Sequence, residues 1–88
     1  MSARSNREDF AKVVRKLKIT SGQIAVLKVL AQSDPWRYQF PPRQKPIIAH
    51  QEYGDLDLRD FPADCFSHVG QSWELTLFGR HVAAHFQS

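Results

Sequence analysis

The chain has few of the sequence features that mark secreted and membrane proteins. It contains one cysteine, Cys65, so no disulfide can form within it. No apolar run approaches the roughly 20 residues that a helix needs to span a bilayer. Residues 1–9 lack the apolar segment of a secretory signal. We therefore expect a cytoplasmic protein that does not enter a membrane.

Catalytic motifs are also missing from the sequence. Its four glycines form neither a phosphate-binding loop nor the tight turn that exposes a nucleophilic serine. Cys65 could pair with a histidine as a nucleophile, but nothing in the sequence orients such a pair. We therefore predict that the protein is not an enzyme and needs no cofactor.

The length and composition are those of a small folded protein. The chain has 88 residues, of which 42% are hydrophobic and 24% are charged, an ordinary balance for a folded chain. The sequence has no internal repeat. We predict a single domain over residues 1–88 with a modest core.

Charge is divided unevenly between the two halves of the chain. Residues 1–45 hold ten of the twelve Lys and Arg residues and three of the nine acids, whereas residues 46–88 hold two basic and six acidic residues. The first half therefore carries +7 and the second −4, which gives the net charge of +3. A basic half favours DNA or an acidic protein surface as the partner. A dipolar globule with solvated charges is the alternative.

The first helix is predicted at residues 6–17. Ser5 and Glu8 have the spacing of a capping box. Apolar residues recur at helical spacing at Phe10, Val13, Val14 and Leu17. Cations fall on the opposite face, at Lys12, Arg15 and Lys16. That basic face is either a solvated surface or a contact for phosphates or an acidic partner.

The second helix is predicted at residues 23–32. Thr20 and Gln23 form another capping box, and Ile19 and Ile24 have the spacing of a hydrophobic staple. The body of the segment is apolar almost all round, which indicates the central buried helix of the domain. Asp34 precedes a proline, which ends the helix.

Residues 35–46 contain four of the five prolines and predict an irregular, extended connection. The aromatic residues Trp36, Tyr38 and Phe40 alternate with polar ones. Such rings can stack on bases or enter a partner's pocket. They can also anchor the loop on a small core, which we expect for at least one of them.

Residues 46–64 fit two interpretations. The segment from Pro46 to Tyr53 could be a short helix that stops at Gly54, or its two isoleucines could open a strand. Leu56 and Leu58 alternate with charged residues, as in a half-buried strand.

Residues 65–75 predict a β-hairpin with its turn near Gly70. Thr76 is placed to cap a final helix over residues 77–86. Gly79 lies early in that helix, where a glycine usually marks close packing against a neighbouring element.

The same segment allows a zinc site as an alternative. Four residues have nearly the spacing of a zinc finger, with a histidine in place of the second cysteine: Cys65, His68, His81 and His85. One thiolate with three imidazoles is an uncommon set of ligands, and the helices already supply a core. We therefore predict no metal site and keep these four residues as the alternative.

Two segments resemble winged-helix regulators of the MarR type. Residues 19–31, ITSGQIAVLKVLA, are similar to the capped helix that opens the helix-turn-helix unit. Residues 73–83, WELTLFGRHVA, are similar to the return strand of the wing and the helix after it. Where that family carries a recognition helix, this chain has a proline-rich loop and an acidic run.

We thus predict an α+β fold that is winged-helix-like, with two N-terminal helices, a small antiparallel hairpin as the wing and a short C-terminal helix. The resemblance implies a non-enzymatic regulator that binds DNA through its basic half. The predicted phosphate contacts are Lys12, Arg15, Lys16, Lys28, Arg37, Arg43 and Lys45. The alternative is a protein-binding inhibitor or adaptor that uses the loop 35–46. Apolar surface on the terminal helices would also allow a homodimer.

Overall fold

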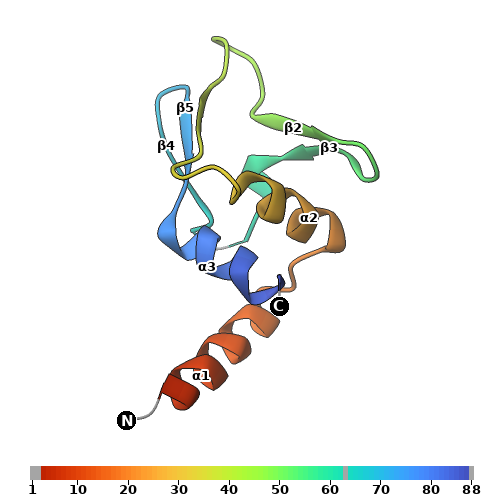
Figure 1. The fold of residues 1–88 in the computed structure, drawn as a ribbon. Coiled ribbons are helices and arrows are strands. Elements are labelled where there is room, and N and C mark those ends of the chain that lie inside the picture. The colour runs from red at the N-terminus through yellow and green to blue at the C-terminus, as the bar shows by residue number, and fades with distance from the viewer. Residues whose placement is uncertain (1–2, 63, 88) are drawn as a thin grey trace.

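A computed structural model of the chain describes residues 3–62 and 64–87. Over these residues the fold is α+β, with three α-helices, one 3₁₀ helix and two small antiparallel sheets. The molecule is elongated, with extents of 47 × 27 × 22 Å. Helix α1 forms one end, and the loop between β1 and β2 forms the opposite end (Figure 1).

Helix α1 (Ala3–Lys16) projects from the body of the protein (Figure 1). It begins earlier than predicted, so Ser5 lies inside the helix and not at its N-cap. Val14 is buried, and the Phe10 ring packs edge-on against Phe78 at 6.0 Å between centroids. One side of α1 is therefore fixed to the body. The predicted apolar face is confirmed at Phe10, Val14 and Leu17, whereas Val13 is 44% exposed.

Helix α2 (Ser21–Leu30) begins with the predicted capping box. The backbone nitrogen of Gln23 donates to Thr20 Oγ1, and Gln23 Oε1 accepts from the Thr20 nitrogen, both at 3.1 Å. Val26 and Leu27 are buried in the core. Val29 is 52% exposed, so this predicted central helix leaves one apolar side chain on its outer face.

A three-stranded antiparallel sheet contains β1 (Arg37–Gln39), β4 (Phe66–Val69) and β5 (Ser72–Leu75) in the order β1-β5-β4. The predicted hairpin is therefore confirmed as β4–β5. The prediction that residues 35–46 are irregular is wrong at β1, because all three residues of this strand pair with β5.

The second sheet is a two-stranded hairpin of β2 (Ile47–His50) and β3 (Gly54–Asp57). The strand interpretation of residues 46–53 therefore holds, and the short-helix interpretation is wrong. Gly54 takes a positive φ of 74°, which a glycine adopts without a steric penalty. The 3₁₀ helix η1 (Leu58–Asp60) follows and buries Leu58.

Helix α3 (Leu77–His85) is capped by Thr76 as predicted, since Thr76 Oγ1 accepts from the Gly79 nitrogen at 3.0 Å. It packs against α2, and these two helices and the three-stranded sheet enclose the core. Among the described residues, the buried hydrophobic ones are Val14, Val26, Leu27, Leu30, Phe40, Leu58, Phe61, Cys65, Trp73, Leu75, Val82 and Ala83.

In the part of the chain that the structure describes, no helix is long and apolar enough to cross a bilayer.

Candidate functional site

The strongest candidate surface is the outer face of α1. Lys12, Arg15 and Lys16 are all exposed, whereas Phe10 and Val14 face the body. At about 100° per residue, the three cations fall on one side of the helix, opposite the two apolar residues. We call Lys12, Arg15 and Lys16 the α1 basic face.

Helix α1 is held in place through Phe10. The Phe10 ring lies edge-on to His81 and His85 of α3, with centroid separations of 6.3 and 6.0 Å, in addition to its contact with Phe78. Aromatic pairs in this geometry stabilise a contact beyond the area that they bury. The contact leaves the α1 basic face directed away from the body.

The other four predicted phosphate contacts lie elsewhere. Lys28 is on α2, and Arg37 on β1 is 3.4 Å from Glu74, which offsets its charge. Arg43 lies between β1 and β2, in the loop that Figure 1 shows at the opposite end of the molecule from α1. Lys45 adds to the effect of Arg59 in lowering the pKa of Asp57, and its contribution is the smaller one. The structure thus gathers three of the seven predicted cations on one face and disperses the rest.

Asp57 and Arg59 form the tightest ion pair among the described residues, with 2.6 Å between Asp57 Oδ2 and an Arg59 nitrogen. Hydrogen bonds from Arg59 hold the pKa of the Asp57 carboxyl below its usual value of 3.8. Asp57 also accepts from the Arg59 backbone nitrogen at 2.8 Å and so caps η1. The pair is local to this turn and stabilises it.

The three aromatic residues predicted to bind a partner have different environments. Phe40 is 5% exposed and belongs to the core. Trp36 packs against that core and lies edge-on to Phe66 at 5.9 Å between centroids. Tyr38 is 50% exposed and is the ring that a partner could reach.

The four residues of the zinc alternative are not brought together. Cys65 is buried, and the His68 ring stacks on Trp73 at 4.3 Å between centroids. His81 and His85 lie against Phe10 on α3. Across residues 3–62 and 64–87, no three His, Cys, Asp or Glu side chains are grouped to hold a metal.

Cys65 is a core residue whose thiol is buried. Its side chain is fully buried, and burial together with the nearby Asp64 carboxylate raises the pKa of the thiol to about 11. The thiolate is the nucleophilic form of cysteine. At neutral pH the group therefore remains a neutral apolar residue, which argues against the Cys–His catalytic pair.

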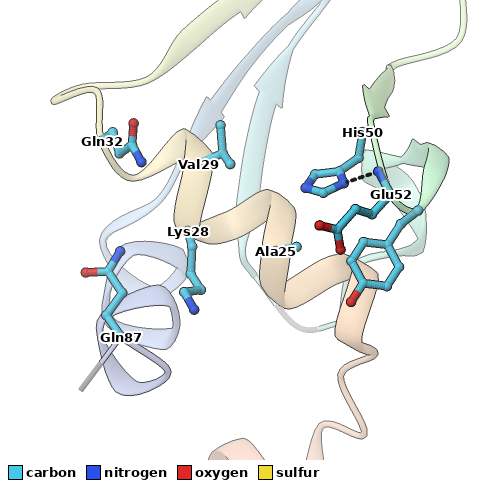
Figure 2. Close-up of a pocket in the computed structure, with 8 residues that line it drawn as sticks. Ala25, Lys28, Val29, Gln32, His50, Glu52 and Gln87 are labelled. Atoms are coloured by element: carbon cyan, nitrogen blue, oxygen red, sulfur yellow. Dashed lines mark hydrogen bonds between the residues drawn. The ribbon is translucent and has the colours of Figure 1, made fainter.

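A groove that the sequence did not predict crosses the exposed face of α2 (Figure 2). Its volume is ≈ 380 Å³, and its apolar lining residues are Ala25 and Val29. The other residues that line it are Lys28, Gln32, His50, Glu52, Tyr53 and Gln87. The spacing of the α2 residues Ala25, Lys28, Val29 and Gln32 places them on one helix face. The other lining residues come from β2, from the β2–β3 turn and from the C-terminal end, and sequence spacing does not predict where these segments lie.

Comparison of the chain with protein-family models, with curated proteins and with solved structures gives no match.

Proposed function

We propose that the protein is a non-enzymatic nucleic-acid-binding domain that contacts duplex DNA through the α1 basic face. The observation that carries the proposal is the position of Lys12, Arg15 and Lys16, three exposed cations on the outer side of a projecting helix. The opposite side of that helix is fixed to the body by Phe10 and Val14. The cations are therefore presented on a supported helix.

A helix of this kind suits the DNA surface for two reasons. An α-helix fits the major groove, and Lys and Arg side chains pair with the phosphates that border it. The outer face carries no Asn or Gln, the side chains that pair with adenine, between Asp9 and Lys18. The binding we propose is therefore governed by phosphate contacts and has little sequence preference.

The winged-helix-like arrangement is part of the same proposal. The strand order β1-β5-β4, with the β4–β5 hairpin leading into a capped helix, supports it. The interval in which that fold carries a recognition helix holds β2, β3 and η1 instead. This is why we assign the DNA contact to α1 and not to a recognition helix.

The salt dependence of binding tests this proposal. Three phosphate contacts predict that the logarithm of the association constant falls with the logarithm of salt concentration at a slope of about −3. Gel-shift titrations of random-sequence duplex at several salt concentrations give this slope. A slope near zero, or no binding at low salt, would contradict the proposal.

A protein-binding module is the second candidate, and the exposed ring of Tyr38 favours it. Tyrosine is enriched at the centres of protein interfaces. Under this alternative, Tyr38→Ala abolishes capture of an acidic partner protein and leaves DNA binding unchanged. Loss of DNA binding in Tyr38→Ala would instead assign the ring to the nucleic-acid surface.

A further inference from the structure

The three-stranded sheet ends at β4, whose outer side is not paired with another strand of the described chain. Natural proteins usually protect such an edge with a charged residue or a proline. The other edge strand, β1, carries Arg37 and is followed by Pro41 and Pro42. Strand β4 has the sequence FSHV, without an acid, a lysine, an arginine or a proline. The β4–β5 hairpin also extends away from α2 and α3 (Figure 1), so the β4 edge is accessible.

The hydrogen bonds of the sheet show which backbone groups point outward. The Thr76 nitrogen donates to the Cys65 oxygen at 3.0 Å, so these opposite residues form a hydrogen-bonded pair. In an antiparallel ladder such pairs alternate with pairs that are not hydrogen-bonded to each other. With the register of β4 and β5, Ser67 therefore faces β5. The N–H and C=O groups of Phe66 and His68 point to the outer side.

We propose that the β4 edge pairs antiparallel with the β4 edge of a second copy, so that their two three-stranded sheets join into one. The register that pairs all four residues places Ser67 opposite Ser67 of the second copy, on the two-fold axis. Phe66 then lies opposite His68 of the second copy. These are the residues whose backbone groups point outward, so each such pair exchanges two N–H···O=C bonds. This inference does not depend on the proposed binding of DNA.

The side chains of β4 suit a second copy of the same strand. No charged groups meet across the axis, since β4 carries no acid, lysine or arginine. The His68 ring stacks on Trp73 at 4.3 Å between centroids, and Phe66 of the second copy would continue this aromatic row. On the other face of the sheet, Val69 is 86% exposed. It would lie beside Cys65 of the second copy and lose part of this exposure.

The size of the interface predicts a weak dimer. Strand β4 has four residues, and one pair of such strands buries less than the roughly 1,200–2,000 Å² of a stable complex. The dimer should therefore form only at high protein concentration.

Sedimentation velocity of the full chain between about 10 μM and about 1 mM, the range of a weak complex, tests the pairing. We expect the fraction of dimer to rise with concentration. A chain that stays monomeric at every concentration would overturn the proposal.

Ser67 allows a charge-swap experiment, because it lies opposite itself in the proposed register. Ser67→Lys and Ser67→Glu each place like charges across the axis, so each variant alone should be monomeric over the same range. An equal mixture should form the dimer again, because lysine then lies opposite glutamate. Persistence of the dimer in Ser67→Lys alone, or failure of the mixture to associate, would contradict the proposed register.

Ala49→Lys is the matched control. It adds the same charge at an exposed position of β2, in the other sheet, and should leave the dimer intact. Ser67 is also exposed and pairs with Glu74 of β5, so a lysine there meets a favourable neighbour and circular dichroism should show an intact fold. Ser67→Lys therefore decides the test even if Ser67→Glu is unstable. Equal loss of the dimer in Ala49→Lys would show that net charge controls association and would overturn the proposal.

Discussion

Gly79 of α3 lies directly against the carbonyl group of Cys65. A Cβ atom at position 79 would overlap with the Cys65 oxygen and would lie 2.6 Å from Leu75 Cδ1. The same carbonyl accepts a hydrogen bond from the Thr76 nitrogen at 3.0 Å. The first turn of α3 is therefore fixed against the chain that leads into β4, and only a glycine fits at the contact.

Gly79→Ala should destabilise the protein by about 1–3 kcal/mol, the range for overpacking a core. Helix propensity alone predicts the opposite, a gain of about 1 kcal/mol for alanine over glycine. Urea denaturation of the two proteins measures the difference in the free energy of unfolding. A more stable variant would show that α3 is not packed against Cys65 in this way.

Trp36→Ala should lower the free energy of unfolding by about 2–4 kcal/mol, because the ring packs on the core beside Phe66. Tyr38→Ala is the matched control, since the Tyr38 ring is half exposed. Its cost should be below about 1 kcal/mol. Equal losses in the two variants, measured by urea denaturation, would contradict the assignment of Trp36 to the core.

Cys65 should react slowly with a thiol reagent in the folded protein at neutral pH and rapidly after unfolding. Because burial raises the pKa of its thiol from 9.0 to about 11, the folded state disfavours the thiolate. The stability due to this group is full below pH 9 and is lost as the pH rises toward 11. In Cys65→Ala, this alkaline loss should disappear. Rapid labelling of the folded chain would show that the thiol is accessible.

Acid should weaken the turn that contains η1. Since the pKa of Asp57 is lowered below 3.8 by Arg59, the carboxylate stabilises the folded state above that pH, and the stability is lost as the pH falls below it. Asp57→Asn should therefore reduce the pH dependence of stability in this acidic range. Thermal unfolding between pH 2 and 6 (about the range that brackets an aspartate pKa) measures it. An unchanged acid profile would argue against the Asp57–Arg59 pair.

Local signals in the sequence are sufficient to predict where α2 and α3 begin. The capping boxes and caps depend on residues within one turn of each other, and both Thr20 and Thr76 cap helices as predicted. The start of α1 was not found in this way, because Ser5 lies inside the helix. The β4–β5 hairpin was also predictable, since its strands are adjacent in the sequence.

Contacts between distant residues were not predictable. Strand β1 forms by pairing with β5, 33 or more residues further along the chain, and no local pattern specifies that partner. The β2–β3 segment was ambiguous because Pro46 and Gly54 fit a helix boundary as well as a hairpin. The sequence identifies the cationic residues, but which of them lie together depends on the direction of α1, which only the tertiary structure gives.

The central claim is tested most directly by two charge-matched triple variants. One replaces Lys12, Arg15 and Lys16 with glutamine; the other makes the same replacement at Lys28, Arg43 and Lys45, and both remove three positive charges. Binding of random-sequence duplex DNA is measured for both at low salt, with circular dichroism confirming the fold. We predict that the first variant loses binding by about 100-fold or more and that the second stays within about threefold of the original protein. Equal losses would mean that net charge alone attracts DNA, and loss in the second variant only would contradict the assignment to α1.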